Sequence, residues 1–490
     1  ALTKKVTQTS VQSQDMTLGE ASLSSGGVMR VDGDNGVSLK SAKLDMGEGG
    51  YLRSKEGTVT NTAIYLEDNE NSRRNVNGRD TTRESWSRTG QASQINAGAG
   101  GFAIESKGDI DLEGVKIKSA GDVSLESKEG AITLKGLKNS AYSKQTQKWT
   151  TKSHWGLVKT DHEKVDETYN ETVDRTTIEA VNYSARAASD KDVTRQGTTI
   201  ISDTIYESGE NNVEQTMELT SLDYHNNKSN SSFSLGGIVK VGDVHSREDE
   251  LKDRAVVNVV NENFATGEIV KEFTGNVLLE GSVLNSSGGP VIIEGNDVQL
   301  KAVTDERTVT TKHSESKFDG FSLDLDGNKM QAGVSTHHKG TTDTTLDYDE
   351  TARGVDISGQ GVQIVARKGK VSGDGTKIHS GNGPLILKGK EGLDFVEAKE
   401  THISEVSHSE DKKQVRAYVG NKWAETAKNI YVSATKGKVK DTATGYGRLM
   451  NDIGDSAETA ATLGFYAGLE VTDTKDKTTV TNGYTAGKGP

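Results

Sequence analysis

Short alternations of apolar and polar residues recur along most of the 490-residue chain, and glycine-rich clusters separate them. Runs such as Val291-Ile-Ile293, Val298-Gln-Leu300 and Leu385-Ile-Leu387 follow the period of two that is typical of β-strands. The clusters between them, such as Gly-Asn-Gly at 381–383, supply the backbone freedom that sharp corners need. The pattern therefore predicts many short strands joined by tight corners.

The strands recur at two spacings. Phe102-Ala-Ile-Glu-Ser106 returns 21 residues later as Val123-Ser-Leu-Glu-Ser127, and the segment 286–295 returns 94 residues later at 380–389. A turn of roughly twenty residues built from short strands is the signature of a parallel β-solenoid. One coil cannot bury its own inward side chains, but stacked coils share a continuous core.

The predicted fold class is therefore all-β, a right-handed parallel β-helix. Its core is expected to be a narrow column of aliphatic side chains that point at the axis. The residues on which this prediction most depends are Val291, Ile293, Val298 and Leu300.

Longer polar segments interrupt the coils, and they begin with similar sequences, such as His313-Ser-Glu315 and His408-Ser-Glu410. Alternating Thr, Val and Tyr within them predicts extruded β-hairpin arms rather than helices. We expect a β-helix over residues 1–421, with arms near 69–98, 140–197, 220–273, 304–353 and 404–421.

The pattern changes after about residue 422. Leu449, Ile453, Ala457 and Ala460 lie at helical spacings and form one apolar stripe. Residues 422–490 are therefore expected to form a helix-containing C-terminal segment, whose last residues from Val471 onward fray.

The composition suits an elongated rod with a narrow core. Only 32% of residues are hydrophobic and 5% are aromatic, which suits a narrow core. The 3 prolines are few because central strands must donate their N–H groups, and the absence of cysteine suits export of an unfolded chain. The net charge of −13, with lysine and arginine interspersed, argues against nucleic acid or anionic membrane as a partner. No apolar run is long enough for a transmembrane segment.

Clusters of possible metal ligands have simpler explanations. Asp324-Leu-Asp-Gly-Asn328 offers oxygen ligands for Ca²⁺ but lacks the rest of a known loop, so outward carboxylates on a hairpin are favoured. Asp32-Gly-Asp-Asn-Gly36 is interpreted as a turn. The pair His337-His338 lacks a third and fourth zinc ligand at suitable spacing. The sequence therefore predicts no metal and no cofactor.

Some β-helices cleave polysaccharides, which requires carboxylates and a cation that converge on one face. Acidic residues do occupy outward coil positions, but lysines are interspersed with them, so a solvated face of mixed charge explains them. The prediction is that the chain is not an enzyme. A polysaccharide-binding or polysaccharide-degrading β-helix, such as a phage tailspike or a lyase, is the alternative. The acids in question are Asp109, Asp111, Glu113, Asp122 and Glu126.

Aromatic residues in the arms have two interpretations. Trp149, Trp155, Tyr169 and Tyr348 could contact a receptor or a glycan, or they could pair across strands and hold the hairpins together. The sequence leaves both open, and it favours the second. Five sequons also occur, at Asn170, Asn182, Asn227, Asn230 and Asn285.

Coils of the type Gly-Asp-Val-Ser-Leu-Glu-Ser, as at 121–127, alternate with arms rich in Ser, His and Lys. In this respect residues 1 to about 420 resemble the haemagglutinin repeats of the filamentous-haemagglutinin family. The members of this family are large exoproteins of Gram-negative two-partner secretion. Long arms followed by a helical segment are most similar to the second repeat region of contact-dependent growth-inhibition effectors.

The resemblance implies export through an outer-membrane β-barrel transporter, display on the bacterial surface as a monomeric rod, and a receptor or glycan on a neighbouring cell as partner. It also implies adhesion or contact-dependent toxin delivery as the function. The sequence contains neither a Val-Glu-Asn-Asn junction nor an Arg-Gly-Asp motif, so toxin attachment and integrin binding gain no support. Because the chain starts and ends within the pattern, we expect it to be a segment of a longer protein.

Overall fold

The computed structural model describes residues 8–14, 21–153, 158–235, 239–326, 331–421 and 465–488. Three ten-stranded parallel sheets wind around one axis, and successive short strands of the chain enter sheets 1, 2 and 3 in turn. The predicted parallel β-helix is thus confirmed. Ten coils at about 4.8 Å each make a rod of roughly 48 Å.

Every strand of the coils is short. Sheet 1 contains β2 (Ala21–Ser25), β5 (Ala42–Met46), β10 (Ser93–Ala97), β13 (Val115–Ser119), β18 (Thr176–Glu179), β21 (Thr198–Ser202), β26 (Glu262–Ala265), β29 (Val283–Ser286), β34 (Asp356–Gly359) and β37 (Lys377–Ser380). Sheet 2 contains β3 (Val28–Gly33), β6 (Gly49–Ser54), β11 (Phe102–Ser106), β14 (Val123–Ser127), β19 (Asn182–Arg186), β22 (Thr204–Gly209), β27 (Ile269–Phe273), β30 (Val291–Gly295), β35 (Val362–Ala366) and β38 (Leu385–Gly389). Sheet 3 contains β4 (Gly36–Lys40), β7 (Thr58–Thr62), β12 (Ile110–Glu113), β15 (Ile132–Lys135), β20 (Val193–Gln196), β23 (Asn212–Gln215), β28 (Val277–Glu280), β31 (Val298–Lys301), β36 (Lys370–Asp374) and β39 (Gly392–Val396).

Long strands leave the β-helix after the sheet 3 strand of every second coil, and they form five antiparallel pairs. These arms are arm 1, β8 (Ile64–Val76) and β9 (Arg79–Gln91); arm 2, β16 (Leu137–Ser153) and β17 (Val158–Asp174); arm 3, β24 (Met217–Leu235) and β25 (Val239–Val259); arm 4, β32 (Val303–Asp326) and β33 (Gln331–Arg353); and arm 5, β40 (Ala398–Asn421) and β41 (Phe465–Lys488). Two coils and one arm make one repeating unit, which explains the spacing of 94 residues.

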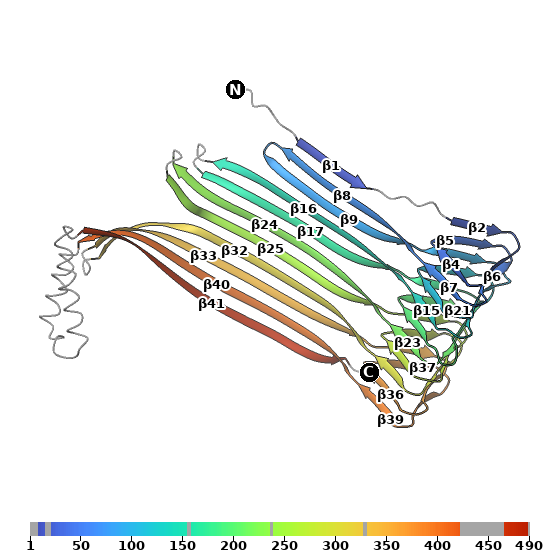
Figure 1. Cartoon of the computed structure of the whole chain (residues 1–490). Helices are drawn as coiled ribbons and strands as arrows, with labels where there is room; N and C mark the ends of the chain where they lie inside the picture. Colours follow the sequence, from blue (N-terminus) through green and yellow to red (C-terminus); the bar gives the residue numbers. More distant parts are fainter. Residues whose placement is uncertain are drawn as a thin grey trace.

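The five arms lie side by side and, with β1 (Gln8–Gln14) at one edge, make a single 11-stranded antiparallel sheet. Figure 1 shows this sheet of arms extending from one side of the β-helix, from the blue arm 1 to the red arm 5. The second strand of each arm pairs with the first strand of the next, at borders that we call seams. Arm 1 turns through Asn77 and Gly78, both with positive φ, as tight two-residue hairpins require.

The core of the β-helix consists of ladders of inward side chains, one from each coil. Val291, Ile293 and Val298 are fully buried, and Leu300 is 1% exposed, as the sequence predicted. Ile293 lies between Lys271 of the preceding coil and Ile364 of the next. Each coil therefore covers the apolar edge of its neighbour, which no coil could do alone.

Several expected arm boundaries were wrong. Residues 176–197 and 262–273, which were assigned to arms, form coil strands of sheets 1 to 3, and residues 93–97 form β10. The arms also begin earlier than expected, so that 64–66 is the base of arm 1 rather than a coil strand. The segments 176–197 and 262–273 were misassigned because Arg195, Asn263 and Lys271 occupy inward positions in them. These polar residues interrupt the apolar alternation that marks a coil strand.

The expectation that the chain frays from Val471 onward was also wrong. Strand β41 runs from Phe465 to Lys488 and pairs along the whole of β40. It lies at the edge of the sheet, where its backbone bonds to β40 along one side, and the side chains of residues 472–487 are almost all exposed. The expected helix at 449–460 lies outside the described residues.

Candidate functional site

An aromatic row crosses the sheet of arms on one of its two faces. Trp86, Tyr142 and Tyr169 stand opposite one another on β9, β16 and β17, and the same register continues to Leu222 on β24. The Trp86 ring is stacked on Tyr142 with centroids 5.9 Å apart and lies 6.1 Å from the ring of Tyr169. Because alternate residues of a strand point to opposite faces, this row defines the aromatic face.

Hydrogen bonds fix these rings. The Tyr169 hydroxyl donates to Glu171 at 2.7 Å, and the Tyr142 hydroxyl donates to Glu167 at 3.3 Å. Burial, and then the hydrogen bond and charge of Glu171, raise the pKa of Tyr169 to about 12. Lys138 neutralises Glu171 at 2.8 Å. The rings are half-buried, so one side of this row remains available to a partner.

A groove of about 630 Å³ lies farther out on the arms. Ion pairs line it, with 3.0 Å between Lys148 and Glu163 and 2.7 Å between Lys228 and Glu248. Burial raises the pKa of Glu248, but hydrogen bonds from Lys228 and Lys312 outweigh burial and lower it to about 2. Thr150, Asn230 and Ser246 add hydrogen-bonding groups, so the groove suits a polar ligand.

The aromatic residues highlighted by the sequence form contacts within the sheet. Trp149 stacks on His162, its cross-strand neighbour, at 4.8 Å, and the Arg79 guanidinium lies 4.4 Å from the Trp149 ring centroid. The Tyr348 hydroxyl donates to Glu350 at 2.7 Å. Cross-strand pairing is thus confirmed for Trp149, whereas Trp155 lies outside the described residues.

The possible metal ligands that the sequence suggested lie only partly within the described residues. Asp324 and Asp326 belong to strand β32, although their side chains and Asn328 fall outside the described part. His338 meets the edge of Phe318, with ring centroids 5.5 Å apart. Within the described ranges, no three His, Cys, Asp or Glu side chains gather as metal ligands would. Within the predicted turn at 32–36, Asp34 and Asn35 connect the end of β3 to the start of β4, and Asp34 pairs with Lys55 at 2.7 Å.

Three of the five acidic coil residues point outward from two different sheets, and Asp109 and Asp122 lie in corners between strands. Asp111 and Glu113 belong to β12 of sheet 3, whereas Glu126 belongs to β14 of sheet 2. Burial, and then the nearby charge of Asp109, raise the pKa of Asp111. Asp109 itself accepts a hydrogen bond from the Ala131 amide at 2.8 Å. This arrangement does not bring the five acids together around one reacting bond.

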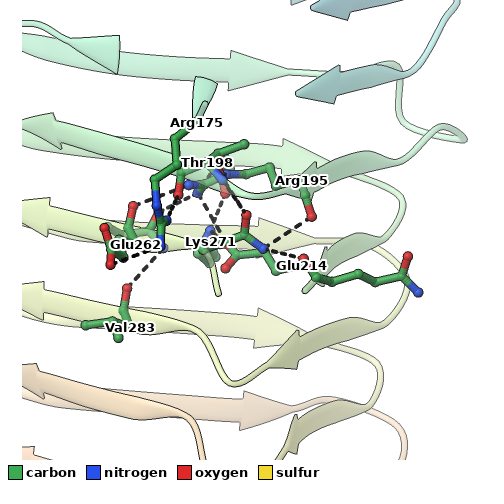
Figure 2. A network of polar contacts seen from close by, with 11 residues as sticks. Arg175, Arg195, Thr198, Glu214, Glu262, Lys271 and Val283 are labelled. Carbon is green, nitrogen blue, oxygen red and sulfur yellow. Dashed lines mark hydrogen bonds and ion pairs between the residues drawn. The ribbon is translucent and has the colours of Figure 1, made fainter. Parts of the chain in front are cut away.

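Sequence reasoning missed a charged cluster inside the β-helix, which Figure 2 shows from close by. Arg195, Glu207, Glu214 and Lys271 have no exposed surface. The Arg195 guanidinium lies 3.3 Å from Glu207 and 3.2 Å from Glu214. The Lys271 ammonium contacts Glu207 as well, and it lies 2.7 Å from Glu214. We call these four residues the buried quartet.

The quartet replaces aliphatic residues in two ladders of the core. Arg195 and Glu214 follow Leu134 in sheet 3. Glu207 and Lys271 follow Ala185 in sheet 2. Two cations balance two carboxylates. Burial raises the pKa of Glu214, but Lys271 and Arg195 outweigh burial and lower it to about 2. With no access to solvent, the quartet joins coils rather than reacting with a substrate.

A signal for the quartet was present in the sequence. Arg195 lies two residues after Val193, and Lys271 lies two residues after Ile269, in strands where Val193 and Ile269 point inward. The period of two therefore places both cations on the inward side. The inward positions of these cations were overlooked because charged side chains usually point to water. Burial of a lone charge costs free energy, whereas burial of a paired charge is tolerated.

Comparison with known families gives a match. A family model described as "Hemagglutinin repeat" matches residues 74–164 and 255–352. Each matched stretch runs from one arm through two coils into the next arm, which is the repeating unit of the structure. The chain is therefore similar to repeats of the filamentous-haemagglutinin type over both stretches. Searches of curated proteins and of solved structures found no match.

Among the described residues, no helix is both long and apolar enough to cross a membrane.

Proposed function

We propose that this chain is a non-catalytic part of a large secreted bacterial surface protein of the filamentous-haemagglutinin type, which presents its sheet of arms to a neighbouring cell. The observation that carries the proposal is the fusion of five arms into one continuous sheet beside the β-helix. A repeat that served only to lengthen a rod would not need arms, whereas a display surface requires them. Adhesion or contact-dependent toxin delivery would use this surface.

The β-helix serves as the support in this proposal. Its inward ladders let each coil fold onto the one before it, which suits a chain that leaves the cell unfolded through an outer-membrane transporter of the two-partner type. The absence of cysteine is compatible with that route. Replacing both Ile293 and Leu300 by Asp is expected to stall secretion, and an unchanged rate of export would contradict this part.

The aromatic face and the groove are the proposed contact region. Half-exposed rings beside hydrogen-bonding groups resemble the anchors that dominate binding energy at protein interfaces. The groove beside Asn230 adds a concave place for a polar group of a receptor or glycan. Adhesion through this face is therefore the function that the geometry supports best.

A matched pair of variants tests the proposal. Asn230 and Asn227 are both exposed residues of β24, but they lie on opposite faces of the sheet. Asn230→Trp fills the groove and is expected to lower binding of the purified chain to target cells by roughly tenfold or more, as loss of an interface anchor would. Asn227→Trp should bind like the unmodified chain.

Equal binding by both variants, or no binding by the unmodified chain, would contradict adhesion through this face. Release of oligosaccharides from a surface polysaccharide incubated with the chain would instead favour the alternative of a polysaccharide-degrading β-helix. Circular dichroism of both variants controls for folding.

A further inference from the structure

Four histidines of the sheet of arms make the same contact. In each, the imidazole Nδ1 lies within hydrogen-bond distance of an aspartate Oδ1 on the strand beside it. The pairs are His225 and Asp166 at 2.7 Å, His313 and Asp249 at 2.5 Å, His402 and Asp349 at 2.6 Å, and His408 and Asp343 at 2.6 Å.

All four pairs cross a seam, and always in the same direction. The aspartate belongs to the second strand of one arm, and the histidine belongs to the first strand of the next. Arms 2 and 3, arms 3 and 4, and arms 4 and 5 are joined in this way. The seam between arms 1 and 2 differs, since Arg83 donates there to Gln145 at 2.8 Å. Three successive seams thus repeat the same histidine–aspartate contact. This contact joins arms that are separated in the sequence by two coils of the β-helix.

The charged groups around His225 and His313 are mostly acidic. Beside His225 lie Asp223 on its own strand, Lys164 next to Asp166 on β17, and Asp249 and Asp253 on β25. Beside His313 lie Glu315 on its own strand, Arg247 next to Asp249 on β25, and Asp343 directly opposite on β33.

The same holds for the seam between arms 4 and 5. His408 faces Asp343, with Glu410 on its own strand and Asp476 diagonally across on β41. His402 faces Asp349, with Asp347 diagonally across on β33 and Glu400 on its own strand. One cross-strand row therefore reads Asp249, His313, Asp343, His408 across four strands.

An imidazole gains or loses its proton between pH 5 and 8. Protonation turns a neutral hydrogen bond to a carboxylate into a charge-assisted one, which is shorter and stronger. The hydrogen bond to Asp166, opposed by burial and supported by the charge of Asp223, raises the pKa of His225. A raised pKa in the folded state contributes stability at low pH, and this contribution is lost as the pH rises through it.

We propose that the seams form a proton-operated clasp, which holds neighbouring arms together more tightly in mildly acidic surroundings than in mildly alkaline ones. The proposal rests on the repeated histidine–aspartate contacts and is independent of the function proposed above. The hydrogen bond from His313 lowers the pKa of Asp249, so this carboxylate stays ionised and able to accept throughout the range in which imidazoles titrate. Strands β14 and β30 of the β-helix, which contain no histidine and turn aliphatic side chains inward, are not expected to show this dependence.

Hydrogen exchange measured by mass spectrometry tests the clasp. After correction for the intrinsic pH dependence of exchange, amides of β24, β32 and β40 are expected to be protected several-fold more at about pH 5.5 than at about pH 8, the range in which imidazoles titrate. Amides of β14 and β30 in the β-helix serve as the internal reference. Equal protection of the arm amides at both pH values would overturn the proposal.

The variant carrying His225→Asn, His313→Asn, His402→Asn and His408→Asn keeps a donor near each Nδ1 position but cannot titrate. It is expected to lose the pH dependence, and persistence of that dependence would overturn the proposal. His379→Asn, at an exposed histidine of β37, should leave the dependence unchanged. If the fourfold variant loses the sheet, His225→Asn alone must abolish the dependence in β24 while β32 and β40 retain it.

Discussion

The β-helix and the sheet of arms are built from the same chain by opposite physical means. Coil strands such as β14 have 5 residues, pair in parallel and turn one face toward a dry core. Arm strands such as β32 have 24 residues and pair antiparallel, and residues 303–318 of β32 are half-buried or exposed on both faces. The β-helix is therefore stabilised by apolar burial, whereas the arms depend on cross-strand pairs of rings and charges.

The comparison shows where one substitution can do most damage. A side chain at an inward coil position cannot move into solvent, because the coils above and below cover it on both sides. Arm positions can relax toward solvent, and each pair in the sheet contributes roughly 0.2–1 kcal/mol. Stability should thus be concentrated in the β-helix, and adaptability in the arms.

The largest effect is expected for Ile293→Asp, which places a carboxylate in the apolar ladder. The free energy of unfolding should fall by about 4 kcal/mol or more, measured by denaturant titration. Ile292→Asp is the matched control, because the neighbouring side chain is half-exposed on the outer surface. Similar losses in both variants would contradict the inward and outward assignment.

The next largest effect is expected at the buried quartet. Lys271→Met leaves two buried carboxylates with one cation and should cost about 3–5 kcal/mol in the free energy of unfolding. Replacing the whole quartet by residues of neighbouring coils should be nearly neutral or stabilising. That variant carries Arg195→Leu, Glu207→Ala, Glu214→Leu and Lys271→Ile. A large loss in the fourfold variant would show that the quartet does more than balance its own charges.

A smaller effect is expected in the arms. Trp86→Ala removes the ring that stacks on Tyr142, and a double-mutant cycle with Tyr142→Ala should give a coupling energy of about 0.5–1.5 kcal/mol. Hydrogen exchange of β9 and β16 is the suitable measurement, because the loss should stay within the arms. Ser87→Ala, on the opposite face, should change exchange little, and faster exchange in β-helix strands would contradict the division between the two regions.

Local sequence patterns predicted much of this architecture. The return of Phe102–Ser106 at Val123–Ser127 fixed the length of a coil, because the two segments are neighbours in one sheet. The alternation in 291–300 identified buried residues correctly, since side chains of a strand alternate between its faces. The match over 74–164 and 255–352 agrees with the repeat that the sequence indicated.

Prediction from the sequence failed where polar residues are buried in the β-helix and where strands pair that are far apart in the sequence. Arg195 and Lys271 made coil strands look like arms, since their cost of burial is offset only by Glu207 and Glu214 on other coils. The end of the chain from Val471 onward was expected to fray because it is polar, whereas its pairing with β40 is a long-range contact that the sequence did not reveal.

The sequence by itself determined the coil, the inward aliphatic ladder and the presence of extruded hairpins, because these depend on residues close together in the chain. Only the tertiary structure decided that the arms join into one sheet, that histidines meet aspartates at the seams, and that four charges neutralise one another in the core. Those contacts join residues that are far apart in the chain, so a local periodic pattern cannot predict them. The energy of each charge depends on its distance from a partner, and only the stacking of coils and arms brings the two charges close together.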